Sequence, residues 1–81
     1  MKEFNQGYEI IAAETYAASD AGLQARIVLG FKETQFGPAY VTWDGSEDAE
    51  GRRDYFWGHY FGNEREARAD YHRRLLSHYE G

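Results

Sequence analysis

The side chains that could carry out acid–base or metal chemistry are few and scattered along this chain. Its only histidines are His59, His72 and His78, and it has no cysteine to act as a nucleophile or thiolate ligand. His72 and His78 are six residues apart, which would put them on different faces of a helix and leave them poorly placed to share a metal. We expect His59, which lies among aromatic residues, to be partly buried and hydrogen-bonded to a tyrosine or a backbone group. The sequence therefore predicts no enzyme active site, no metal and no cofactor.

Carboxylates form the densest cluster of charge. Asp44, Glu47, Asp48 and Glu50 fall within one short segment, and the whole chain has a net charge of −5. The segment lacks the alternating ligand positions and the final bidentate glutamate of a calcium-binding loop. An acidic segment favours approach to a basic partner, such as a protein that itself binds nucleic acid. The same charge could equally do no more than keep a small domain in solution.

Turn-forming residues divide the rest of the sequence into short stretches. Gly, Asp and Ser predict turns or loops at three places: 19–22, 37–38 and 44–51. Alternation and enrichment in β-branched and aromatic residues predict strands at 24–32, 39–44 and 54–61. In the first of these strands, alternation places Ile27, Leu29 and Phe31 on one face and Val28 on the other. A further stretch, 8–16, would tolerate a helix, but it is short and is followed by a turn, so we predict a first strand there.

The C-terminal segment 63–79 has the clearest helical pattern. Asn63 is a favourable N-cap, and Glu66 three residues later completes a capping box. Two acid–arginine pairs, Glu64 with Arg68 and Asp70 with Arg74, are spaced to interact one turn apart on a helix. The apolar stripe is formed by Ala67, Tyr71, Leu75 and His78, with Leu76 and Tyr79 beside it. Because this stripe is weak for a fully buried helix, we expect the helix to cover a single face of a sheet. Residues 1–81 therefore predict one small α+β domain. Its antiparallel sheet would have three or four strands in ββββα order, with the C-terminal helix packed on one face.

Strict alternation along residues 54–61 assigns the aromatic residues to two faces. One set is Tyr55, Trp57, His59 and Phe61, and the other is Phe56, Gly58 and Tyr60. We place the first set under the helix because it is the larger and more apolar. Tyr40, Phe56 and Tyr60 would then face outward on the side that the helix leaves uncovered.

An open aromatic surface with acidic residues at its rim is typical of a protein-binding interface. We predict that this interface contains Asp44, Glu47, Asp48, Glu50, Tyr40, Phe56 and Tyr60. The same rings could instead stack the bases of single-stranded nucleic acid, although the excess of acids opposes phosphate binding. They could also complete the core or form a homodimer contact. No stretch has the roughly 20 apolar residues of a membrane helix, so we expect a cytoplasmic chain with no membrane partner.

Four pieces of the sequence resemble a pattern in short proteins of phages, plasmids and conjugative elements. They are Leu29–Gly30, Tyr40–Trp43, Tyr55–Phe61, and Ala67 with Asp70, Tyr71 and Arg74; together they span about residues 28–75. The Thr-Trp and Gly-His-Tyr-Phe pieces are the most specific, and the resemblance implies no catalytic residue. It implies a context in which small acidic proteins are similar in style to anti-CRISPR and anti-restriction inhibitors. By this analogy the expected partner is a host defence protein, either a CRISPR effector subunit or a restriction component. It would be bound at its nucleic-acid-binding surface, with no direct binding of nucleic acid by the chain itself.

Overall fold

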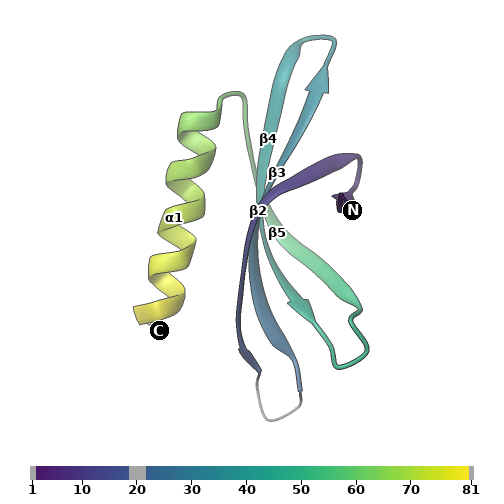
Figure 1. The fold of residues 1–81 in the computed structure, drawn as a ribbon. Helices are drawn as coiled ribbons and strands as arrows, with labels where there is room; N and C mark the ends of the chain where they lie inside the picture. The colour runs from purple at the N-terminus through teal and green to yellow at the C-terminus, as the bar shows by residue number, and fades with distance from the viewer. Residues whose placement is uncertain (1, 19–21, 81) are drawn as a thin grey trace.

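The computed structural model describes residues 2–18 and 22–80, which form a five-stranded antiparallel sheet followed by one helix (Figure 1). The strands lie in the sheet in chain order: β1 (Phe4–Asn5), β2 (Tyr8–Ala18), β3 (Gln24–Thr34), β4 (Gly37–Glu47) and β5 (Arg53–Phe61). The helix, α1, spans Glu64–Glu80 and lies along one face of the sheet. The predicted α+β fold with a C-terminal helix is confirmed, but the sheet has five strands instead of three or four.

The additional strand is β1, a two-residue strand joined to β2 by a tight turn. Gln6 and Gly7 form this turn with φ angles of 52° and 84°. Positive φ at both central residues matches the twist of the flanking strands, and glycine adopts it without strain. A strand of two residues has no alternation to detect, so the sequence pattern did not predict it.

The long strands extend further than their sequence patterns indicated. β3 and β4 pair in an unbroken register from Gln24 and Glu47 to Thr34 and Gly37. Residues 44–47, predicted to be part of a loop, are therefore the end of β4, and the tight turn lies at 35–36 instead of 37–38. Ladder hydrogen bonds with β3 outweigh the local turn preference of Asp, Gly and Ser. Of the turn predicted at 19–22, residues 19–21 lie outside the described residues.

One hydrophobic core lies between α1 and the sheet. Ile27 and Leu29 of β3 are buried against Ala67 and Tyr71 of α1, with Leu75 packed beside them. These contacts confirm the predicted apolar stripe of the helix. Further along the helix, the side chains of residues 78 and 79, which were predicted to continue this stripe or lie beside it, are outside the described part of the chain.

The start of α1 has the predicted cap. Oδ1 of Asn63 accepts a hydrogen bond from the backbone N–H of Glu66 at 2.9 Å. Glu64 and Arg68, one turn apart on the exposed side of the helix, form an ion pair at 2.6 Å. Both interactions depend only on residues close in sequence, which is why they could be predicted.

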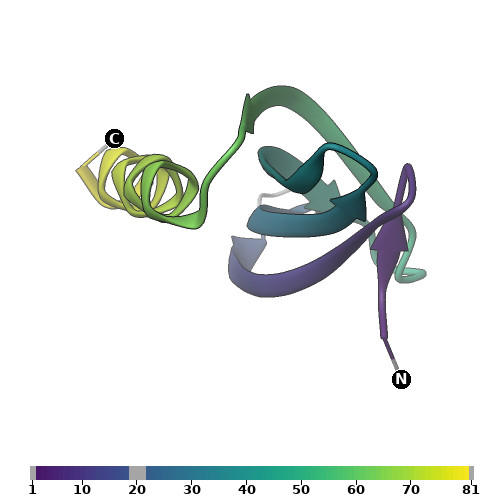
Figure 2. The ribbon, with the colours of Figure 1, turned by 90° about the horizontal axis from the view of Figure 1, so that it is seen from above.

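A second core fills the opposite side of the sheet, where β2 and β5 bend away from α1 (Figure 2). Val28, Val41 and Trp43 are buried there. β2 and β5 approach each other across this core, since the rings of Tyr8 in β2 and Tyr60 in β5 have centroids 6.3 Å apart. The expectation that a single helix leaves an open aromatic face is therefore wrong. The sheet curls and encloses most of that face itself.

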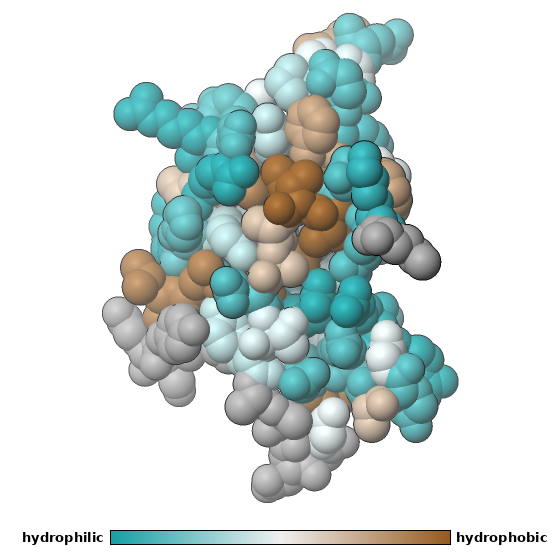
Figure 3. All heavy atoms as spheres, in the orientation of Figure 1, coloured by the Kyte–Doolittle hydropathy of each residue, from teal (hydrophilic) through white to brown (hydrophobic). Residues whose placement is uncertain are grey.

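The exposed edges of the sheet, formed by β5 and by the part of β2 that lies beyond its pairing with β1, carry irregularities that oppose pairing with a further strand. In β2 the register shifts between Ile10 and Ala12 and again between Thr15 and Ala18, and β5 has a shift of its own. Bulges bend an edge and interrupt its row of hydrogen-bonding groups. Figure 3 shows strong hydrophobic colour near the centre of the visible face. Ile11, the bulged residue of β2, is 39% exposed.

Candidate binding surface

Asp70 of α1 is a buried carboxylate that joins the helix to the sheet. Its Oδ2 accepts hydrogen bonds from the Thr42 hydroxyl at 2.5 Å and from Nε of Arg74 at 3.1 Å. The same oxygen lies 3.1 Å from Nδ1 of His59, and Oδ1 accepts a bond from Arg73 at 2.9 Å. Thr42, His59, Asp70 and Arg74 are referred to below as the Asp70 network. We expected His59 to be partly buried and to bond a tyrosine or a backbone group. It instead lies within hydrogen-bonding distance of a carboxylate, and 58% of its side chain is exposed.

Arg74 connects α1 to both β4 and β5. Its Nη1 forms an ion pair with Asp44 at 2.8 Å, and its Nε also donates to the Thr42 hydroxyl at 3.1 Å. Its Nη2 donates to the backbone carbonyl of Trp57 at 2.5 Å. A guanidinium presents its donors in a rigid plane, so one arginine can hold several acceptors in fixed positions. This side chain therefore fixes the backbone of β5 as well as the helix.

Trp57, whose carbonyl is held in this way, lies in a bulge of β5. Trp57 and Gly58 together lie opposite the single residue Trp43 of β4, because the register shifts at this point. Trp57 has a φ of 55°, a left-handed conformation that costs a non-glycine residue about 1–3 kcal/mol. At Gly58 a Cβ atom would lie only 2.8 Å from Nε1 of Trp43. Glycine is therefore needed at this position for β5 to approach the indole.

The bulge turns the side chain of Trp57 out to solvent. Trp57 is 72% exposed and its neighbour Phe56 is 40% exposed. Their rings are in edge-to-face contact with centroids 4.9 Å apart. Phe56 also lines a hollow of about 660 Å³ beside α1, together with Ala25, Ile27, Gly45, Arg74 and Ser77. We refer to Phe56 and Trp57 as the bulge patch.

The bulge also corrects the predicted arrangement of side chains along β5. Of the four residues assigned to the helix side, His59 and Phe61 do face α1. Tyr55 instead packs in the opposite core, and Trp57 points to solvent. The additional residue in β5 shifts the alternation by one position, so a strict two-residue period cannot hold along the whole strand.

The three predicted aromatic contact residues do not share one surface. Tyr40 is not directed outward but packs at the edge of the helix-side core, with its ring 5.2 Å from that of Phe31. Phe56 lies opposite Asp44 and so is also on the helix side. Tyr60 is on the other side of the sheet and is 58% exposed. Among the three, Phe56 alone belongs to the bulge patch.

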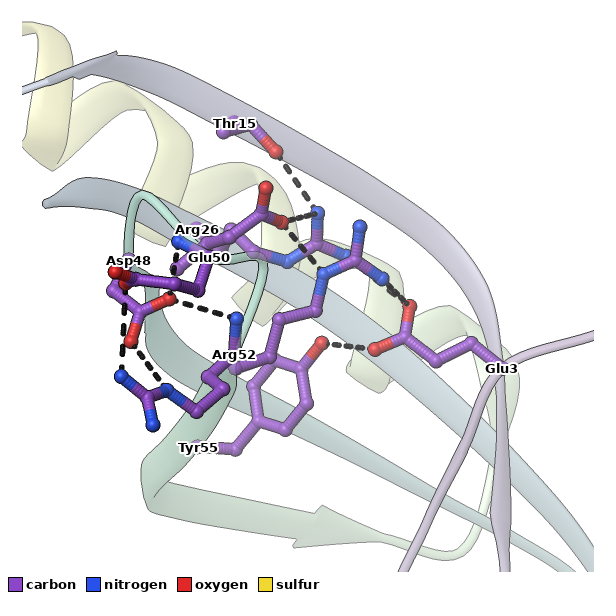
Figure 4. Close-up of polar contacts among 9 residues, drawn as sticks. Glu3, Thr15, Arg26, Asp48, Glu50, Arg52 and Tyr55 are labelled. Carbon is purple, nitrogen blue, oxygen red and sulfur yellow. Dashed lines mark hydrogen bonds and ion pairs between the residues drawn. The ribbon is translucent and has the colours of Figure 1, made fainter.

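The predicted acidic residues at the β4–β5 loop are used to build that loop (Figure 4). Oδ1 of Asp48 accepts bonds from the backbone N–H groups of Glu50 and Arg52, and Oδ2 accepts one from Nε of Arg52 at 2.8 Å. The backbone and side-chain bonds from Arg52 hold the pKa of Asp48 below its usual value. Glu50 lies 3.6 Å from the same guanidinium. Asp48 is thus a turn-forming residue in this loop.

The other two predicted acids are also paired with arginines. Asp44 pairs with Arg74, as described above, and Glu47 pairs with Arg53 at 2.6 Å. Glu3 joins the Glu47 pair from the N-terminal side: it contacts Arg53 at 2.8 Å and accepts a bond from the Tyr55 hydroxyl (Figure 4). Arginines from β3, β5, the loop and α1 thus neutralise most of the local charge. The four acids do not form an unpaired acidic patch.

Burial alone would raise the pKa of the Asp70 carboxyl. Hydrogen bonds from Thr42, His59 and Arg74 together outweigh burial, and the pKa lies below its usual value. An aspartate in an unfolded chain has a pKa of about 3.9, so the folded state binds this proton less readily than the unfolded state. The ionised network therefore stabilises the fold above about pH 4, and the contribution is lost as pH falls through the folded-state pKa.

We accordingly expect acid to destabilise the chain partly through Asp70. Urea unfolding measured from about pH 7 down to about pH 2 should show stability falling below about pH 4. The variant Asp70→Asn cannot ionise at this position, so its stability should depend less steeply on pH over the acidic range. The same acidic slope in both proteins would show that Asp70 does not contribute.

The described residues 2–18 and 22–80 contain no group of three His, Cys, Asp or Glu side chains arranged to hold a metal ion. In this same part of the chain, no helix has both the length and the apolar character needed to cross a membrane. No protein-family model, curated protein or solved structure matches the chain.

The residues that carry the sequence resemblance contact one another in the fold. Thr42, His59, Asp70 and Arg74 form the Asp70 network, and Gly58 lies against Trp43. These residues join α1 to the sheet and shape the bulge.

Sequence patterns missed two exposed aromatic residues, Trp57 and Phe36. Alternation assigned Trp57 to the inside, although a glycine within an aromatic strand, here Gly58, is a known sign of a bulge or a close backbone approach. Phe36 is 91% exposed and immediately precedes Gly37 and Pro38. The position of Phe36 beside two turn-forming residues could have indicated that its side chain is exposed at a turn.

Proposed function

We propose that this chain is a binding protein, not an enzyme, and that the bulge patch is the centre of its contact surface. The observation that carries the proposal is the conformation of Trp57, which is 72% exposed and has a φ of 55°. Large exposed aromatics are unfavourable in a free chain, and left-handed backbone at a tryptophan adds strain. Backbone strain of this kind clusters at functional sites, and tryptophan is the residue type most enriched at binding hot spots.

The position of Trp57 is also well suited to binding. Arg74 holds its carbonyl, and the Asp70 network holds Arg74 in turn. A contact residue on a fixed backbone loses little conformational freedom when a partner binds. The hollow beside Phe56 offers room for a partner side chain next to the exposed indole.

For the partner, we propose a host nucleic-acid-binding defence protein, such as a CRISPR effector subunit or a restriction component. Support comes from the resemblance to proteins of mobile elements and from the net charge of −5. Because the β4–β5 loop acids are paired with arginines, attraction to a basic partner would arise from the field of the whole chain and not from that loop. Such attraction mainly speeds encounter and fades as salt rises.

Affinity capture with matched baits tests this function. The baits are the wild type, Trp57→Asn and Leu76→Asn, and the extract comes from the host in which the chain is naturally made. Asparagine tolerates left-handed φ, so the first variant removes the indole without disturbing the bulge, while Leu76 is an exposed apolar control on α1. We expect one nucleic-acid-binding protein to be retained by the wild type and the Leu76 variant but not by the Trp57 variant. Equal retention by all three baits would count against the bulge patch.

A second candidate function is stacking of single-stranded nucleic acid on Trp57. The observation that favours it is the exposure of the Trp57 ring in β5, the strand that also carries the largely exposed His59. Fluorescence anisotropy of labelled single-stranded DNA and RNA at low salt separates the two functions. We expect no binding at micromolar concentrations, whereas salt-sensitive binding lost in Trp57→Asn would favour nucleic acid over protein as the partner.

A further inference from the structure

The hollow beside Phe56 lies between the C-terminal half of α1 and the parts of β3, β4 and β5 nearest the β4–β5 loop. Its volume of about 660 Å³ is within the range of about 300–1,000 Å³ that ligand pockets have. Its lining side chains are apolar at Ala25, Ile27 and Phe56 and polar at Asp44, Arg74 and Ser77. A lining of this kind suits a long side chain with an apolar stem and a polar end.

The two arginines at the hollow have little capacity left to bind an anion. The terminal nitrogens of Arg26 donate to Thr15 and Glu3, and its Nε is enclosed. These contacts lie on the other side of the sheet, where Tyr55 of the second core donates to the same Glu3 carboxylate. Every nitrogen of the Arg74 guanidinium already has an acceptor. The hollow is therefore a poor site for a carboxylate or a phosphate.

The polar groups that remain available at the hollow can accept hydrogen bonds. Oδ1 of Asp44 pairs with Arg74, whereas no bond to the other oxygen of this carboxylate is found in the described part of the chain. Ser77 is exposed and lies in the last turn of α1, where the backbone carbonyls carry partial negative charge. A positively charged group with several donors would satisfy these acceptors.

Two further acids lie near the hollow on the same side of the sheet. Glu14 of β2 is opposite Ile27, a residue of the helix-side core, and opposite residues of paired strands share a face. Asp54 is two positions before Phe56 in β5, with no register shift between them. No ion pair is found for Glu14 or Asp54 within residues 2–18 and 22–80. The face around the hollow therefore keeps negative charge that no ion pair neutralises.

The exposed rings of the bulge patch add a second attraction for cations. Phe56 lines the hollow, and Trp57 is in edge-to-face contact with it. The face of an aromatic ring attracts a cation, and the indole does so most strongly. A guanidinium is planar, so it can stack on a ring while it donates to a carboxylate, which an ammonium group cannot do as well. Of the basic side chains, arginine therefore fits this site best.

We propose that the hollow receives an arginine side chain of the partner protein, with its stem against Ile27 and Phe56 and its guanidinium directed to Asp44. This inference rests on the proposed function and names the chemical group that the contact surface recognises. Proteins that bind nucleic acid present arginines on the surface that contacts phosphates. An arginine bound in the hollow could no longer make such a contact.

Peptide titration of the full chain, followed by its amide NMR spectra, tests the proposal without the partner. The probe is acetyl-Gly-Arg-Gly amide, and the comparison peptides carry glutamate or norleucine in place of arginine. We expect saturable shift changes at the amides of Ile27, Gly45 and Phe56 with the arginine peptide alone. No saturable change with that peptide at millimolar concentration would overturn the proposal, as would equal changes with either comparison peptide.

Charge placed at the mouth of the hollow provides the matched variants. Ser77 is exposed on α1, so Ser77→Lys and the neutral control Ser77→Gln should both unfold at the wild-type urea concentration. We expect Ser77→Lys to bind the arginine peptide at least about 5-fold more weakly, because like charges repel. Ser77→Gln should bind it as the wild type does. Equal binding of the peptide by the two variants would contradict a cation in the hollow.

The same variants used as baits separate this inference from the proposed function. Ser77→Lys should lose the partner that Ser77→Gln retains. If the arginine peptide occupies the hollow but Ser77→Lys still captures the partner, an arginine of the partner is not part of the contact. If Trp57→Asn retains the partner while Ser77→Lys loses it, the bulge patch fails as the contact centre and the hollow remains.

Discussion

Replacing Asp70 with alanine should lower the free energy of unfolding by about 1–3 kcal/mol, the range for leaving buried hydrogen-bonding groups without their partner, because Arg74 keeps its ion pair with Asp44. The substitution leaves the guanidinium of Arg74 and the hydroxyl of Thr42 without their common acceptor in a buried setting. Unpaired buried polar groups lose their hydrogen bonds to water without regaining them in the protein. Urea unfolding followed by circular dichroism measures the change.

Glu64→Ala is the matched control for this substitution. Glu64 also forms an ion pair with an arginine one turn along α1, at 2.6 Å from Arg68, but both side chains are largely exposed. An exposed pair contributes about 0–1 kcal/mol, so this variant should unfold close to the wild type. If Asp70→Ala were as mild as Glu64→Ala, the Asp70 network would not be what holds the helix to the sheet.

The second large effect is expected at Trp43. Trp43 is 2% exposed, and its ring contacts Tyr8 and Tyr55 at centroid distances of 5.7 Å and 5.8 Å. Truncating a buried aromatic to alanine costs about 3–5 kcal/mol through lost burial and the cavity left behind. A small domain has only about 5–15 kcal/mol of total stability, so Trp43→Ala should be marginally folded at best.

The chain offers its own control in its other tryptophan. Trp57→Asn removes a ring that is 72% exposed and relieves left-handed strain of about 1–3 kcal/mol. It also loses an edge contact with Phe56 that is worth about 0.5–1.5 kcal/mol. The two effects oppose each other, so we expect the free energy of unfolding to stay within about 1 kcal/mol of the wild type. Equal destabilisation by both tryptophan substitutions would contradict the assignment of Trp43 to the core and of Trp57 to the surface.

The parts of the fold that the sequence predicted are those determined by nearby residues. The cap at Asn63 and the pairing of Glu64 with Arg68 act within one turn of helix. The faces of the central strands follow a strict period of two, which correctly separated Ile27 and Leu29 from Val28. Neither kind of signal requires knowledge of which strand lies next to which.

Gly58 was a sign of a bulge in β5, but its effect on the side-chain directions could not be predicted because it depends on the register with β4. The sequence of residues 54–61 is compatible with unbroken alternation, and only the pairing with Trp43 shows that Trp57 and Gly58 count as one position. A shift of one residue reverses the direction of the side chains before it. Tyr55 was therefore assigned to the wrong core and Trp57 to the inside.

The acidic loop was misjudged for a related reason. Four carboxylates close together in sequence predicted a local patch, but the arginines that pair with them include distant residues. Arg74 comes from α1 and Arg26 from β3, and no sequence spacing indicates that they approach Asp44 and Glu47. Curling of the sheet likewise brings Glu3 to Arg53, at the opposite edge. These contacts exist only once the sheet has formed.

The central claim, that Trp57 is exposed for binding, is tested most directly by the affinity of the purified partner for Trp57→Asn relative to the wild type. Titration calorimetry should be carried out on samples whose unfolding free energies agree within about 1 kcal/mol, with Leu76→Asn as the control. We predict at least about 30-fold weaker binding for Trp57→Asn and unchanged binding for the control. Wild-type affinity in a folded Trp57→Asn variant would contradict the account.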